Sequence, residues 1–388
     1  MNPRNRTNPH PILIVTLLLT VLLILDGCTS ERNESGMQHG ALLGVHIAET
    51  DGADAYAERL ERAASLGARV IRIPVDWAQL EPNPGTFDED YLAELRQRLD
   101  TLDRLNMSAV MLFAQSPGWA NGGRGPAYPP LAAYRDHFGN ALLRLIEALL
   151  AHAGHILAWE VWNEPNSIEF WPDSPAPRNG THVLVPLDAA TAYAALLETA
   201  HDRVKARFPD VTILGGVLAS ADTDYLRALL DTWNDRALPM DALSVHPYSR
   251  VDERPGPHYG LAQYPEQCND DDPLSPPWCF AEGLSQLRSL LNERSLPDVS
   301  IWITEFGVAS GTHWGEAGSE TEQARHLRLA VEWLNRHSGR EALNIPVALW
   351  YRLIDEQADL EAGDRFGLYR ENGTEKPSAR AFADLARR

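Results

Sequence analysis

Two glutamates follow apolar stretches that are typical of buried strands. Glu164 comes two residues after the run 156–162, and Pro165 behind it cannot extend a strand ladder. Glu305 directly follows a second apolar run, residues 299–304. Either glutamate alone is most simply a solvated loop residue. Together, two strand-end carboxylates suggest a pair in which one side chain donates a proton while the other stays ionised.

The elements that must position this pair alternate strand-like and helix-like patterns along the chain. Eight apolar runs are predicted strands, at residues 42–47, 70–75, 109–113, 156–162, 211–216, 242–246, 299–304 and 346–351. Amphipathic stretches follow them, at residues 53–66, 91–105, 131–151, 189–208, 222–233, 284–292, 320–337 and 378–387. This order predicts an α/β fold, a single (β/α)8 TIM barrel over residues 40–388.

The alternative architecture is an open, doubly wound sheet. Such a sheet would be expected to carry a glycine-rich phosphate turn after its first strand, and Gly44-Val-His-Ile-Ala is not one. In a TIM barrel the catalytic residues lie at the carboxyl ends of the strands, which is where Glu164 and Glu305 are predicted to stand.

Two motifs around these glutamates resemble those of a known clan. Trp162-Asn-Glu-Pro-Asn166 and Ile303-Thr-Glu-Phe-Gly307 are similar to the acid/base and nucleophile motifs of the clan A retaining glycoside hydrolases. The wider context most resembles family 39, which includes β-xylosidases and α-L-iduronidases, and related bacterial exopolysaccharide hydrolases. The resemblance implies that Glu164 is the acid/base and Glu305 the nucleophile of a double displacement on a poly- or oligosaccharide.

The resemblance also assigns roles to residues at other strand ends. Asn163 would bind the sugar 2-hydroxyl, and Arg72 would stand beside the nucleophile and favour its ionised form. His246 and Tyr248 resemble the pair on the sixth strand, in which the tyrosine hydroxyl orients the nucleophile. Trp350 resembles the aromatic floor of the reacting subsite. Arg72 could equally form a structural salt bridge, and His246 could be a hydrogen-bonded core residue.

The eleven tryptophans offer candidate sugar-stacking platforms. Those in or near predicted loops of the active face are Trp77, Trp119, Trp171, Trp278 and Trp314. Ordinary packing is the alternative for each. Platforms around the rim predict an endo-acting enzyme on a cell-envelope or biofilm polysaccharide. The alternative is closure of one end by loop 249–283, which would indicate a xylosidase-like exo-enzyme. A transglycosylase and a non-catalytic glycan-binding barrel are the other function classes left open.

The first residues read as a targeting segment. Arg4 and Arg6 precede the apolar run 12–25, which predicts a signal peptide over residues 1–27. Cys28 ends a lipobox-like sequence and is a predicted lipidation site, followed by a polar tether over residues 28–39. The alternative is an uncleaved signal anchor. Both interpretations predict an exported protein tethered to a membrane, in a bacterial periplasm or cell envelope.

Composition limits the partners. The formal net charge of −20 argues against nucleic acid, because phosphate binding needs clustered basic residues. It also disfavours a polyanionic glycan. No His-x-His pair or carboxylate cluster with metal-ligand spacing is present in the sequence, so we expect no metal. We also expect no other cofactor and a monomeric protein. Cys268 and Cys279 are a predicted disulfide in an exported protein, with free thiols or a metal site as the alternatives.

Overall fold

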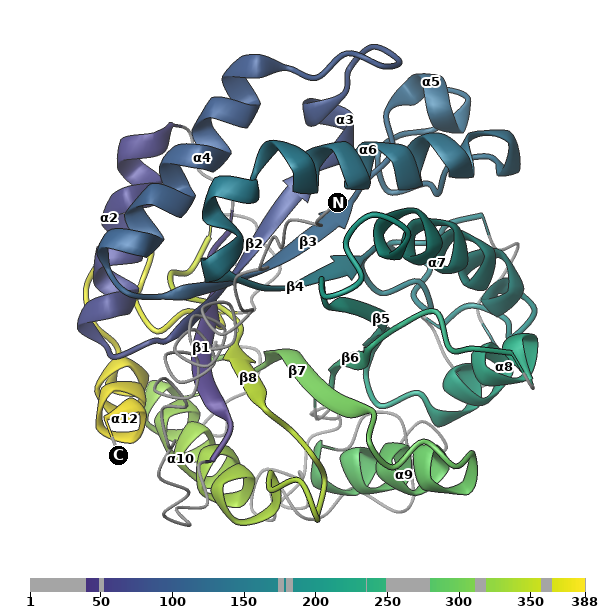
Figure 1. The fold of residues 1–388 in the computed structure, drawn as a ribbon. Coiled ribbons are helices and arrows are strands. Elements are labelled where there is room, and N and C mark those ends of the chain that lie inside the picture. Colours follow the sequence, from purple (N-terminus) through teal and green to yellow (C-terminus); the bar gives the residue numbers. More distant parts are fainter. Residues whose placement is uncertain are drawn as a thin grey trace, which may run out of the picture. The chain divides into compact units, whose positions relative to one another are not determined.

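Eight parallel strands close into a barrel in sequence order (Figure 1). They are β1 Leu42–His46, β2 Val70–Asp76, β3 Ser108–Ala114, β4 Ile156–Val161, β5 Ile213–Ala219, β6 Ala242–His246, β7 Ser300–Phe306 and β8 Val347–Trp350. Strand β1 pairs with β2 on one side and with β8 on the other, which completes the ring. The predicted TIM barrel is confirmed.

The computed structural model describes residues 40–48, 52–173, 178, 184–234, 236–248, 280–310, 319–356 and 365–387. Residues Gly40–Arg388 form one compact unit. Within the described part of the chain, no helix is sufficiently long and apolar to cross a membrane. Cys28, Cys268, Cys279, Trp278 and Trp314 lie outside the described residues, as do the segments 1–27 and 28–39. The signal peptide, lipidation, membrane attachment and disulfide therefore stay predictions.

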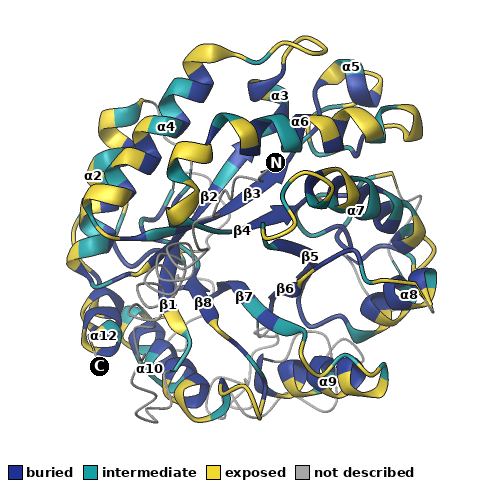
Figure 2. Ribbon diagram, viewed as in Figure 1, coloured by how far each residue is buried: buried dark blue, intermediate teal, exposed yellow. Residues whose placement is uncertain are grey.

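Helices surround the barrel and cover the outer face of the strands (Figure 1). The main ones are α2 Ala53–Ser65, α4 Glu89–Arg104, α6 Arg135–Ala148, α7 Ala189–Lys205, α8 Thr223–Trp233, α9 Phe280–Glu293, α10 Glu320–His337 and α12 Pro377–Ala386. Figure 2 shows their inward faces buried and their outward faces exposed. In α8 the buried Tyr225, Leu226, Leu229 and Trp233 recur at helical spacing, so one stripe packs against the barrel.

Strand alternation fills the barrel interior in two layers. Val70, Ala158 and Ala242 belong to an apolar cluster contributed by six strands, separate from the core beneath the helices. Two residues further along their strands stand Arg72, Glu160 and Ser244, which are also buried. Because side chains two apart share one face of a strand, this apolar layer is followed by a polar one toward the carboxyl ends.

A buried ion pair ties together the segments that follow β7 and β8. The Lys376 ammonium lies 2.8 Å from the Asp355 carboxylate and donates to the Ser310 hydroxyl and the Arg365 carbonyl at 3.2 and 3.1 Å. Replacing Lys376 by alanine leaves Asp355 buried without this cation. We expect the free energy of unfolding to fall by about 3–5 kcal/mol, as measured by urea denaturation.

The matched control is the exposed pair between Arg340 and Asp298, whose atoms lie 3.1 Å apart. Its Arg340→Ala variant should lose less than about 1 kcal/mol, because water and salt screen an exposed pair. Equal, small losses in both variants would show that the pair at Lys376 does not hold these segments.

Candidate active site

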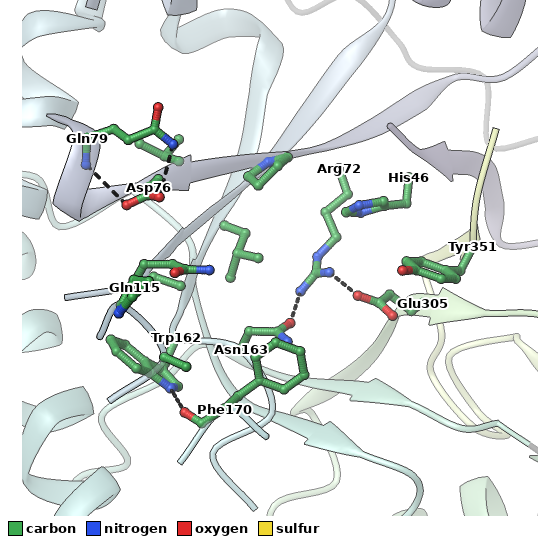
Figure 3. A pocket seen from close by; sticks show the side chains of 16 residues that line it. His46, Arg72, Asp76, Gln79, Gln115, Trp162, Asn163, Phe170, Glu305 and Tyr351 are labelled. Carbon is green, nitrogen blue, oxygen red and sulfur yellow. Dashed lines mark hydrogen bonds and ion pairs between the residues drawn. The ribbon is translucent and has the colours of Figure 1, made fainter. Parts of the chain in front are cut away.

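A cavity of about 230 Å³ opens at the carboxyl ends of the strands. His46, Arg72, Asn163, Glu305 and Tyr351 line it from β1, β2, β7 and the residues that follow β4 and β8. Figure 3 shows the Arg72 guanidinium reaching between Asn163 and Glu305. The structure therefore brings residues that are far apart in the sequence to one polar site.

Glu305 is held as a carboxylate by its neighbours. Its two oxygens accept hydrogen bonds from the Arg72 guanidinium and from the Tyr248 hydroxyl, the latter at 2.7 Å. Burial alone would raise the pKa of Glu305, but the charges of a protonated His246 and of Arg72, with the bond from Tyr248, lower it to about 2. An ionised carboxylate with one hydrogen bond on each oxygen is suited to nucleophilic attack.

Arg72 is both a buried salt-bridge residue and a neighbour of Glu305. Its Nε donates to Glu160 at 2.5 Å, and Nη2 donates to the Asn163 side-chain oxygen at 2.9 Å. Burial would lower the pKa of Arg72, but the charges of Glu160 and Glu305 raise it above its ordinary value. The sequence left open whether Arg72 forms a structural salt bridge or stands beside Glu305. In the structure one guanidinium does both, because it contacts Glu160 and Glu305.

Glu164 faces His246 across the site. The Nδ1 atom of His246 lies 2.7 Å from Glu164 Oε1. The backbone of Glu164 has a φ of 41° and that of Trp162 a φ of 73°, values that L-residues adopt rarely and that cluster at functional sites. The structure thus places Glu164 at the same end of the barrel as Glu305, with one oxygen of each within 4.8 Å of the other.

The loop that carries Glu164 is fastened to the end of β5. The Asn166 side chain exchanges two hydrogen bonds with the backbone of Ala219, at 2.9 and 2.8 Å, and donates to Asp222 at 3.1 Å. Arg178 closes the group by donating to both oxygens of Asp222, at 2.9 and 2.7 Å. These bonds can offset the strained backbone that precedes Asn166.

One oxygen each of Glu164 and Glu305 and one ring nitrogen of His246 lie within 4.8 Å of one another. Among the described residues this is the one group whose ligand atoms could hold a metal ion. The Arg72 guanidinium touches Glu305, however, and its fixed positive charge would repel a cation at that oxygen. We therefore assign no metal to the group.

Three of the tryptophans predicted to contact sugar are buried in the structure. Trp77 and Trp350 are fully buried, and Trp171 is 4% exposed. Trp77 packs edge-on against Trp119, and Trp171 packs against Trp162. The prediction that Trp77, Trp171 and Trp350 bind sugar is therefore corrected. Their indole rings pack against other side chains between the barrel and its helices, so a sugar cannot stack on them.

Other residues line the cavity without having been predicted. Tyr351 follows β8 one residue after Trp350, and Phe170 lies on the loop after β4. Gln115 also lines the cavity, with a φ of 70°. His46 lies beside Tyr351, and burial lowers its pKa to about 3. His46 is therefore uncharged near neutral pH.

Sequence comparisons find similarity to known glycoside hydrolases. Residues 35–350 match the family profile described as Cellulase (glycosyl hydrolase family 5). A curated β-xylosidase from Geobacillus stearothermophilus is 25% identical over 151 residues, which are 39% of this chain and 26% of that protein.

Two solved structures share the fold. A family 39 glycoside hydrolase from Bacteroides cellulosilyticus WH2 has a TM-score of 0.63 and 21% identity, covering 90% of this chain and 64% of that one. A GH5_18 protein from Streptomyces cattleya in complex with GlcNAc has a TM-score of 0.63 and 16% identity, covering 90% and 80%. The chain thus spans about a quarter of the curated relative and less than two thirds of the first structure.

Proposed function

The chain belongs to the cellulase family, glycosyl hydrolase family 5, and from this premise we propose that it cleaves O-glycosidic bonds by a retaining double displacement. The resemblance to clan A glycoside hydrolases that the two motifs indicated is thereby confirmed. One observation carries the proposal of retention. Oxygens of Glu164 and Glu305 lie within 4.8 Å of each other, whereas inverting enzymes separate their carboxyl groups by about 6.5–9.5 Å.

In the proposed first step, Glu305 attacks the anomeric carbon while Glu164 gives its proton to the leaving oxygen. The glycosidic bond breaks and a covalent bond to Glu305 forms. In the second step, Glu164 takes a proton from water as the oxygen of that water attacks the same carbon and releases Glu305. In the same proposal Asn163, whose side-chain oxygen accepts a hydrogen bond from Arg72, binds the hydroxyl next to the reacting carbon.

The stereochemical course tests the mechanism. Proton NMR of the first product formed from an aryl glycoside should show the anomer with the configuration of the substrate. The opposite anomer, before mutarotation, would require a water molecule between the two carboxylates and would refute the double displacement.

We propose exo action on a neutral glycan, in place of the endo action that the sequence predicted. The cavity, at about 230 Å³, is smaller than the roughly 300–1,000 Å³ of typical ligand pockets, which suits a chain end better than a long chain segment. Of the tryptophans on which an endo-acting groove would rest, Trp77 and Trp171 are buried. The similarity to a β-xylosidase favours the same mode. The net charge of −20 argues against a polyanionic substrate.

Early products separate exo from endo action. Incubation of the enzyme with an intact polysaccharide that it can cleave should release monosaccharide or disaccharide, while the viscosity of the solution stays nearly constant. An early fall in viscosity with a ladder of oligosaccharides would establish endo action on a cell-envelope or biofilm polysaccharide. Sugar transferred to an added acceptor in preference to water would make the enzyme a transglycosylase.

A further inference from the structure

A chain of hydrogen bonds crosses the barrel interior from Glu160 to Glu164. The Ser244 hydroxyl lies 2.6 Å from Glu160 Oε1 and 2.7 Å from the Thr304 hydroxyl. Thr304 Oγ1 lies 3.1 Å from Nε2 of His246, and Nδ1 of His246 lies 2.7 Å from Glu164. Glu160, Ser244, Thr304 and His246 are all buried, so water does not compete for these bonds.

The donors in this chain follow one another in a fixed order. Glu160 is a carboxylate paired with Arg72, so it only accepts, and Ser244 must donate its single hydroxyl hydrogen to it. In the hydrogen bond between the two hydroxyls, Thr304 must then be the donor and the Ser244 oxygen the acceptor. With its hydrogen spent, Thr304 can only accept from His246, so Nε2 of His246 carries a hydrogen.

We propose that Ser244 and Thr304 are positioning residues that fix the proton of His246 on Nε2, so that Glu164 and the bare Nδ1 share the single catalytic proton. This inference rests on the acid/base role proposed for Glu164. When the leaving oxygen takes the proton, the Nδ1 lone pair is left facing the Glu164 carboxylate. Repulsion between them favours the return of a proton from water in the second step.

Several other charged or titratable groups surround this pair, and all of them remain in the variants that test it. Glu305 Oε2 lies 3.8 Å from Nδ1 of His246. Electrostatic interactions also reach the pair or its partner Glu305 from Arg72, His46, Tyr248 and Glu169. A change produced at Thr304 or Ser244 therefore reports the hydroxyl chain and not the removal of a charge.

Thr304→Val tests the proposal because valine keeps the shape and removes the hydroxyl. His246 is then free to carry its proton on Nδ1 and to donate to the Glu164 carboxylate, which stabilises the ionised form. The basic limb of the kcat/KM profile should move to lower pH by about one unit. At pH values above the shifted limb, the kcat/KM of the variant for glycosides with poor leaving groups should fall by about tenfold. For an activated dinitrophenyl glycoside, kcat/KM should stay at the wild-type value.

Two further variants separate positioning from packing. Thr304→Ser keeps a hydroxyl and should restore the wild-type profile. Ser244→Ala leaves Thr304 in place but frees its hydrogen to donate to Nε2, so the basic limb should again move to lower pH. An unshifted limb in both Thr304→Val and Ser244→Ala, with equal rate losses for both leaving groups, would overturn the proposal.

Nitrogen NMR of isotope-labelled histidine gives a readout that does not depend on turnover. In the wild-type protein, neutral His246 should carry its proton on Nε2. A proton on Nδ1 would refute the positioning role even if the enzyme is a retaining glycosidase. Conversely, a proton on Nε2 in a protein that cleaves no glycoside would leave the hydrogen-bond chain intact and refute the proposed function.

Discussion

Glu305→Gln is expected to lower kcat by at least about 10⁴-fold on any glycoside, the scale of loss seen when a catalytic nucleophile is removed. An amide is a poor nucleophile, so the covalent bond to the sugar does not form. The shape of the side chain is retained, and one of its two hydrogen-bonded positions can still accept from Arg72 or Tyr248. The fold should therefore survive while the reaction stops.

The measurement is single-turnover kinetics on an activated aryl glycoside, because its leaving group departs without protonation by an acid. The matched control is Glu332→Gln, an exposed glutamate on α10, which should keep the wild-type rate. Circular dichroism and urea unfolding should be close to wild type for both variants. If Glu305→Gln kept a rate near wild type, another group would have to be the nucleophile.

Strand order and strand-end chemistry were predictable because both depend on local sequence. Continuous apolar runs form strands that are buried on both faces, between the barrel interior and the covering helices, and a carboxylate at the end of such a run lies at the barrel mouth. Glu164, Glu305, Asn163, His246 and Tyr248 lie together for this reason.

Trp350 shows where the prediction failed and which signal could have corrected it. Val347 and Leu349 face the barrel interior, so alternation turns Trp350 outward toward the helices and turns Tyr351 inward toward the cavity. A shift of one residue exchanges the two faces of a strand. Counting from Val347 would therefore have selected Tyr351 and excluded Trp350.

The same counting places Glu160 inside the barrel, two residues after Ala158. It does not give the partners of Glu160, because Arg72 and Ser244 come from strands β2 and β6, whose stagger across the barrel is set by the closed sheet. Strand alternation thus predicts on which face of its strand each member of the chain lies. The hydrogen bonds that connect these members to His246 could be identified only from the three-dimensional structure.

Glu164→Ala is expected to divide the two steps of the reaction. Glycosides with poor leaving groups should lose about 10²–10⁴-fold in kcat/KM, because no group remains to protonate the departing oxygen. A dinitrophenyl glycoside should still transfer its sugar to Glu305 and then stall, since no base activates water. This pattern would appear as a burst of phenolate followed by slow turnover.

Azide should rescue the stalled enzyme, because it is an anionic nucleophile that needs no base and can enter the space left by Glu164. It attacks the anomeric carbon, releases Glu305 and yields a glycosyl azide of the original configuration. Glu164→Gln is the matched control, since its side chain fills that space and should reduce the rescue. Equal loss for both leaving groups, with no azide product, would assign the acid/base role to a residue other than Glu164.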